Sequence, residues 1–257
     1  MSTLKLTLLQ QPLVWMDGEA NLRFFDNLLS GLIDRDLIVL PEMFTTGFAM
    51  EAAKSSLPEA RVIAWLHEKA RAANAMVGGS AAIQTERGAV NRFLLVTPEG
   101  VVHRYDKRHL FRMADEHHHY LAGDRREIIE WRGWRILPQV CYDLRFPVFS
   151  RSRGDYDLAL YVANWPAPRA AHWQALLLAR AIENQAYVAG CNRVGSDGNQ
   201  HHYSGDSRII SPQGETLAAG EPQQPAVLNT ELSLDALRDY RERFPAWRDA
   251  DAFSLND

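Results

Sequence analysis

The chain reads Trp134-Arg-Ile-Leu-Pro-Gln-Val140-Cys141-Tyr-Asp-Leu-Arg145 near its middle, where an apolar run ends at a cysteine and a polar turn. A short run of this kind predicts a strand, and its end would deliver Cys141 to the edge of a sheet. A lone cysteine is more often a small core residue than a nucleophile, and Cys191 fits the core interpretation. A catalytic role for Cys141 therefore needs support from other parts of the chain.

Two further apolar runs lead to a reactive side chain. Glu42 follows Leu37-Ile-Val-Leu40, and Lys107 follows the run from Val101 to Tyr105. A carboxylate at the end of a buried strand is costly unless it is paired or used, although a salt bridge for Glu42 and a solvated surface position for Lys107 are the ordinary alternatives. Amide hydrolysis needs a nucleophile, a base, and positive charge or N–H donors at the developing oxyanion. A glutamate, a lysine and a cysteine at three strand ends supply this set.

The pattern along the chain predicts an α/β fold, because strands alternate with helices over the first two-thirds. Helices are predicted at 21–30, 58–73 and 172–185, and strands at 4–9, 37–40, 75–83, 93–96, 136–142, 158–162, 187–191, 208–211 and 226–228. No repeat or long linker interrupts this pattern, so residues 1–257 are interpreted as one domain. Residues 238–257 are interpreted as a polar C-terminal extension whose aromatic side chains dock on the same chain or on a neighbouring subunit.

Composition narrows the class of protein. The formal net charge of −4 at pH 7 offers no electrostatic footprint for nucleic acid, and no stretch reaches the roughly 18 apolar residues that span a bilayer. Two cysteines are too few for a disulfide framework, so reduced thiols and a cytoplasmic location are expected. The chain has no Gly-x-Ser-x-Gly elbow, which argues against an α/β-hydrolase triad.

Three segments carry a resemblance to a known family. They are Pro41-Glu42-Met43-Phe44, Tyr105-Asp-Lys107-Arg-His-Leu-Phe111 and Cys141-Tyr-Asp-Leu-Arg145-Phe-Pro147, and their key residues are separated by 65 and then 34 positions. Together they resemble the signature segments of the nitrilase superfamily, the carbon–nitrogen hydrolases with a Glu-Lys-Cys triad. Similarity at Asn164-Trp-Pro and over 180–188 extends the resemblance across nearly the whole chain.

The resemblance implies a four-layer α-β-β-α sandwich, a small amide substrate, no cofactor, and a homodimer or higher homo-oligomer. By position, Glu42 is expected to act as general base, Lys107 as oxyanion stabiliser and Cys141 as nucleophile. Glu116 is similar in position to a second glutamate that the family places beside the lysine, and an ordinary loop carboxylate is the alternative. The backbone N–H of Tyr142 is expected to assist Lys107 at the oxyanion.

Within the family, the form of the cysteine segment and the Arg241 to Pro245 spacing resemble the bacterial omega-amidases, also called 2-oxoacid amidases. That resemblance implies release of ammonia from 2-oxoglutaramate or 2-oxosuccinamate through a thioester on Cys141. Arg145 is then expected to hold the substrate carboxylate by a bidentate pair, with an ion pair to Asp143 or Asp155 as the alternative. The remaining substrate contacts are assigned to Asn164 and Trp165.

Other interpretations compete with this one. Nitrile and N-carbamoyl amide hydrolysis use the same triad, and a binding protein on the same fold has no activity at all. A metal centre is considered because histidines cluster at His117–His119 and His201-His202, beside Asp115 and Glu116. Consecutive histidines are expected to point in different directions and no His-Glu-x-x-His spacing occurs, so no metal is expected.

One local feature conflicts with the predicted strands. Pro138 falls inside the strand that leads to Cys141, although a central strand needs a backbone N–H at each ladder position. A bulge or an edge-facing position at Pro138 would reconcile the two.

Overall fold

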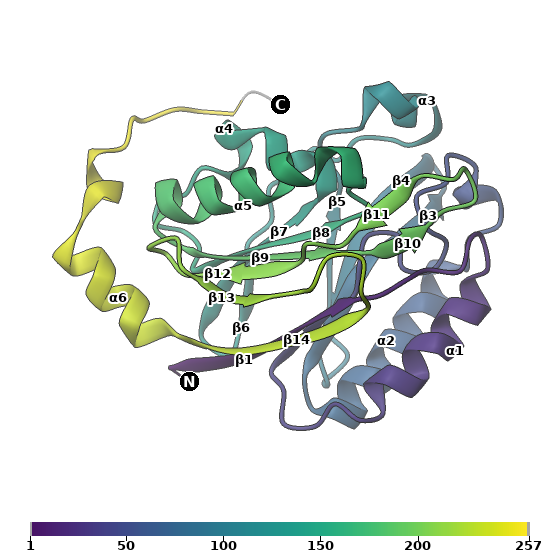
Figure 1. Cartoon of the computed structure of the whole chain (residues 1–257), viewed down its shortest axis with the longest axis horizontal. Helices are drawn as coiled ribbons and strands as arrows, with labels where there is room; N and C mark the ends of the chain where they lie inside the picture. The colour runs from purple at the N-terminus through teal and green to yellow at the C-terminus, as the bar shows by residue number, and fades with distance from the viewer. Residues whose placement is uncertain (1, 256–257) are drawn as a thin grey trace.

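The computed structural model describes residues 2–255 and arranges them in four layers (Figure 1). Two six-stranded sheets stack face to face, and helices cover the outer face of each. The first sheet, in spatial order, consists of β14 (Ala226–Ser233), β1 (Thr3–Gln10), β2 (Leu37–Val39), β3 (Met76–Thr85), β4 (Gly88–Val96) and β5 (Val102–Asp106). The second consists of β13 (Thr216–Ala219), β12 (Arg208–Ile210), β9 (Tyr187–Asn192), β8 (Leu158–Ala163), β7 (Trp134–Val140) and β6 (Ile129–Trp131).

The helices lie outside the two sheets. The structure contains α1 (Gly18–Leu29), α2 (Glu59–Ala73), α3 (Glu116–His119), α4 (Pro147–Ser150), α5 (Ala170–Asn184) and α6 (Leu234–Arg243), and a separate hairpin of β10 (Val194–Ser196) and β11 (His202–Ser204). Apolar side chains from both sheets form the central core between them. A second core lies beneath α1 and α2, and a third beneath α5. These three cores define the α-β-β-α order of layers, which confirms the expected sandwich.

Local sequence explains how the main elements begin, end and approach one another. Asp17 caps α1 by accepting a hydrogen bond from the Ala20 backbone N–H at 2.9 Å, and α2 ends at Asn74 in the left-handed conformation. At Gly78 a Cβ atom would lie 2.0 Å from the carbonyl oxygen of Leu94, so only glycine allows β3 to approach β4 this closely.

Pro138 lies where one side of β7 is open. It is paired with Leu160 of β8, whereas β6 pairs with β7 only from Trp134 to Ile136. Beyond Ile136 the second ladder has ended, so the missing N–H of proline removes no bond on that side. Of the two arrangements expected for Pro138, a bulge or an edge-facing position, the unbroken register of β7 with β8 favours the edge-facing position.

The C-terminal segment packs on its own chain. Leu237 of α6 is buried in the core between the sheets, and Arg241 forms an ion pair with Asp157 at 3.1 Å. The Trp247 backbone N–H donates to Gln185 Oε1 at 3.0 Å. These contacts favour intrachain docking of the extension. Within residues 2–255, none of the helices combines the length and the apolar character needed to cross a membrane.

Candidate active site

Glu42 lies in the turn that follows β2, and its carboxylate is fully buried. Oε1 accepts hydrogen bonds from Asn91 Nδ2 at 2.7 Å and from Lys107 Nζ at 3.1 Å, while Oε2 accepts from the Asn164 backbone N–H at 2.7 Å. The Asn164 side chain also donates to the Glu42 carbonyl oxygen at 2.6 Å. Donors from both sheets therefore fix the carboxylate in one orientation, as a buried charge requires.

Lys107 follows β5 and is buried between two carboxylates. Its Nζ lies 3.0 Å from each oxygen of Glu116 and 3.1 Å from Glu42 Oε1. Burial by itself would lower the pKa of Lys107, but the negative charges of Glu116 and Glu42 outweigh burial and raise that pKa above its ordinary value. The lysine is therefore a permanent cation at neutral pH.

Glu116, at the start of α3, is the second partner of the lysine. Besides Lys107, its Oε2 accepts a hydrogen bond from the Phe111 backbone N–H at 2.6 Å. Burial raises the pKa of Glu116, and the charge of Lys107 opposes that rise. The structure places this residue beside the lysine, as the family resemblance implied, and the alternative of an ordinary loop carboxylate is wrong.

Cys141 occupies a sharp turn between β7 and the 3₁₀ helix Cys141–Arg145. Its φ of +45° lies in the left-handed region, which costs a non-glycine residue roughly 1–3 kcal/mol and is typical of functional positions. Burial raises the pKa of the thiol well above its usual value, and Glu42 raises it further, while Lys107 acts in the opposite sense. The resting thiol is therefore protonated and lies within electrostatic range of both charged groups.

Asp143 holds the turn in place. Its buried carboxylate accepts hydrogen bonds from the backbone N–H groups of Val140 and His109, both at 2.9 Å, and from the Tyr105 hydroxyl at 2.7 Å. The same carboxylate lies 2.7 Å from His109 Nδ1. Asp143 thus ties the cysteine turn to the lysine segment.

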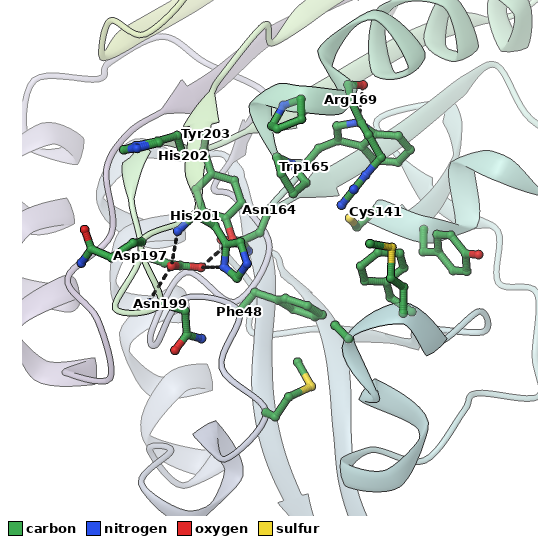
Figure 2. A pocket seen from close by; sticks show the side chains of 18 of the residues that line it. Phe48, Cys141, Asn164, Trp165, Arg169, Asp197, Asn199, His201, His202 and Tyr203 are labelled. Atoms are coloured by element: carbon green, nitrogen blue, oxygen red, sulfur yellow. Dashed lines mark hydrogen bonds and ion pairs between the residues drawn. The ribbon is translucent and has the colours of Figure 1, made fainter.

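A cavity of about 580 Å³ opens above Cys141 and Lys107 (Figure 2). Its lining includes all four residues expected to contact the substrate, which are Tyr142, Arg145, Asn164 and Trp165. It also includes residues that were not predicted from the sequence to lie at the site, among them Phe48, Arg169 and Tyr203. No spacing pattern marks these three, because Phe48 lies in a loop, Arg169 at the start of α5 and Tyr203 in the β10–β11 hairpin, and the position of each depends on the whole fold.

Arg145 lies against Trp165 and not in an ion pair. Its guanidinium carbon is 4.7 Å from the centre of the Trp165 ring, and Nη2 lies 3.1 Å from His172 Nδ1. Asp155 pairs with Arg126, and the Asp143 carboxylate is used by the turn. The alternative of an Arg145 ion pair with either aspartate is therefore wrong.

Arg169 is a second arginine at the cavity. Figure 2 shows its side chain extending from the start of α5 toward Cys141, and its guanidinium carbon lies 5.4 Å from the centre of the Phe111 ring. Within residues 2–255, neither Arg145 nor Arg169 has a carboxylate within 4.0 Å. The lining of the cavity therefore includes two arginines that have no acidic partner.

The two histidine clusters behave differently from each other. His201 turns toward the cavity, where its Nδ1 lies 3.2 Å from the buried Asp197 carboxylate (Figure 2). In the other cluster, the rings of His117 and His118 lie side by side with their centres 3.9 Å apart. The expectation that consecutive histidines point apart is wrong for this pair, whose rings lie together although both residues belong to the short helix α3.

Comparison with known proteins agrees with this geometry. The carbon–nitrogen hydrolase family matches residues 5–242. The chain is 70% identical over 255 residues to the omega-amidase YafV of Escherichia coli K12, covering 99% of this chain and 100% of that protein. It is 35% identical over 222 residues to the 2-oxoglutaramate amidase of Bacillus subtilis, covering 83% and 84% of the two chains.

A solved structure extends the likeness to three dimensions. A CN-hydrolase superfamily protein from Xanthomonas campestris, solved with an arsenic adduct in its active site, superposes with a TM-score of 0.97 at 46% identity over 100% of both chains. The buried Glu42, Lys107 and Glu116 cluster beside Cys141 thus occurs in a fold shared with that superfamily. The chain belongs to the carbon–nitrogen hydrolase family, the nitrilase superfamily that its three segments resemble.

Proposed function

We propose that this carbon–nitrogen hydrolase is an omega-amidase, which converts the monoamide of a 2-oxo dicarboxylic acid to the diacid and ammonia. The observation that best supports this proposal is the distribution of charge around the cavity. Arg145 and Arg169 line the cavity without acidic partners, whereas Glu42 and Glu116 are buried on either side of Lys107, which lines the cavity beside Cys141. A free carboxylate is attracted to the two arginines and repelled by the two buried glutamates, so the neutral amide is the end of the substrate that faces Cys141.

Cys141, Glu42 and Lys107 can perform both halves of the reaction, which are formation of the thioester and its hydrolysis. Glu42 accepts the thiol proton as Cys141 Sγ attacks the amide carbon, and Lys107 stabilises the oxyanion that forms. Protonated Glu42 then gives its proton to the departing nitrogen, so ammonia leaves and a thioester remains. Glu42 next deprotonates a water molecule, which attacks the thioester, and the proton returns to the sulfur as the acid is released. Glu116 holds Lys107 in position throughout, through its two contacts of 3.0 Å.

The proposal agrees with the activities of two relatives, an omega-amidase at 70% identity and a 2-oxoglutaramate amidase at 35% identity. It is tested by ammonia release from a panel of substrates at equal concentration. We expect 2-oxoglutaramate and succinamate to be hydrolysed faster than a nitrile, an N-carbamoyl amino acid or the neutral amide pentanamide. Preference for any of the last three would contradict the proposal, and no turnover of any compound would favour a binding protein.

The two arginines give a more specific prediction. Replacement of Arg169 or Arg145 by alanine is expected to lower kcat/KM for 2-oxoglutaramate by about 10- to 100-fold, since a hydrogen bond to a charged group contributes about 1.5–3 kcal/mol. Pentanamide, which has the same chain length and no carboxylate, should change by less than about threefold. The exposed Arg23 of α1 lies outside the cavity and supplies the control, Arg23→Ala. An equal loss on the neutral amide would refute carboxylate recognition by these residues.

Three wider expectations belong to the same proposal. Residues 1–257 form one domain in which 238–257 is an extension, the protein acts in the cytoplasm, and it assembles as a homodimer or higher homo-oligomer. Support for assembly comes from α5, which exposes 39% of Leu178 and 49% of Ile182 on the outer side of the second sheet. Sedimentation of the purified protein measures the assembly directly, and a monomer at micromolar concentration would contradict it.

A further inference from the structure

The histidine-rich turn between Phe111 and Tyr120 contains a cluster that the amide chemistry does not use. One oxygen or nitrogen atom from each of Asp115, His117 and His118 lies within 4.8 Å of the other two. In addition, Nδ1 of His117 is buried and has no hydrogen-bond partner within residues 2–255. A buried polar atom without a partner requires an explanation, and a bound ion is one of the few that apply.

The donor set indicates which ions suit the cluster. Two imidazoles and one carboxylate are ligands of borderline transition metals, whereas Mg²⁺ and Ca²⁺ prefer oxygen donors alone. Three protein ligands also leave one position of a tetrahedral ion for water, which is the pattern of open zinc sites. We propose that Asp115, His117 and His118 bind a divalent transition-metal ion of the Zn²⁺, Ni²⁺ and Cu²⁺ class, and that this ion restrains amide hydrolysis.

The link to activity is Glu116, which lies between the ligands in the sequence. Ligand atoms that surround a zinc ion at about 2.0–2.1 Å stand about 3.4 Å apart, and the three ligand atoms here lie within 4.8 Å of one another. We infer that the ion draws them into the closer spacing when it binds. Asp115 is already in the left-handed conformation at φ +57°, and Glu116 follows it directly. Contraction therefore moves the backbone that holds the Glu116 carboxylate 3.0 Å from Lys107 Nζ.

The binding step is tested without substrate, so its outcome does not depend on the proposed function. The full-length Cys141→Ser protein is used because a free thiol also binds Zn²⁺. Calorimetric titration with ZnCl₂ should show one ion per chain, and His118→Ala in the same background should weaken binding at least tenfold. His119→Ala removes the third, exposed histidine of the run, which lies outside the cluster, and should change the affinity less than twofold. No binding below about 100 μM, or equal losses in the two histidine variants, would overturn the site.

The restraint on activity is tested with Cys141 intact and with whichever amide the protein hydrolyses best. Zn²⁺ should inhibit the unmodified chain and His119→Ala at similar concentrations, and a chelator should restore the rate. His118→Ala should retain the basal rate and require at least tenfold more Zn²⁺ for the same inhibition. If His118→Ala is inhibited at an unchanged concentration, the ion acts at the thiol and the coupling to Glu116 is refuted.

Discussion

A Cys141→Ala variant is expected to lose amide hydrolysis by about four orders of magnitude or more, with its fold intact. Removing the nucleophile of a covalent mechanism leaves only substrate binding and oxyanion stabilisation. These two effects together retain only a small fraction of the original rate. The methyl group of alanine fits the space of the thiol, and the turn keeps the Asp143 contacts to Val140, Tyr105 and His109. Ammonia release under saturating substrate measures the loss, and circular dichroism checks the fold.

Cys191 supplies a matched control for this prediction. It is fully buried in the core between the sheets, and its Sγ lies 3.5 Å from the Leu9 carbonyl oxygen and 3.6 Å from that of Val39. Cys191→Ala should keep the rate within a few-fold, because it changes core packing alone. Iodoacetamide should label and inactivate the unmodified chain and Cys191→Ala alike. Substantial turnover by Cys141→Ala would remove the thioester mechanism.

The sequence predicted the parts of the site that depend on strand ends. Buried strands leave a recognisable apolar run, and the residue beyond each run is delivered to the edge of a sheet, which is how Glu42, Lys107 and Cys141 could be identified. The three lie together because β2 and β5 belong to one sheet and β7 to the other, with the sheets stacked. That stacking was implied by family resemblance and could not be deduced from periodicity, which describes one element at a time.

The rest of the site depends on tertiary positions that no local pattern encodes. Arg169 reaches the cavity because α5 starts beside it. Phe48 reaches it because a long loop folds back and places the Phe48 ring centre 5.1 Å from Lys107 Nζ. Asp143 was considered only as a partner for Arg145, yet its carboxylate is already engaged with Val140 and His109. The contacts that position these side chains join residues more than twenty positions apart, or lie in a turn whose conformation depends on the segments packed around it.

Lys107→Met is expected to lower both the rate and the stability of the protein. Loss of an oxyanion donor costs on the order of 10²–10³ in kcat. The same change leaves two buried carboxylates, those of Glu42 and Glu116, without the cation that both contact. Breaking a buried ion pair in this way costs about 3–5 kcal/mol of the free energy of unfolding. An exposed lysine, Lys54, pairs with Glu51 at the surface, and Lys54→Met should cost only about 0–1 kcal/mol and leave the rate unchanged.

The loss of stability in Lys107→Met should also depend on pH. The direction of that pH dependence identifies the cause of the loss. Burial raises the pKa of the Glu116 carboxyl group, and without the opposing charge of the lysine that pKa lies further above the unfolded value of about 4.3, so the folded state binds more protons than the unfolded state. The free energy of unfolding then falls as pH rises above that value, and the deficit relative to the unmodified chain is larger at pH 8 than at pH 5. Adding Glu116→Gln removes one of the two buried charges, so it should recover part of the stability in urea denaturation without recovering the rate. A deficit independent of pH would mean that lost packing of the lysine stem, and not unpaired charge, destabilises the variant.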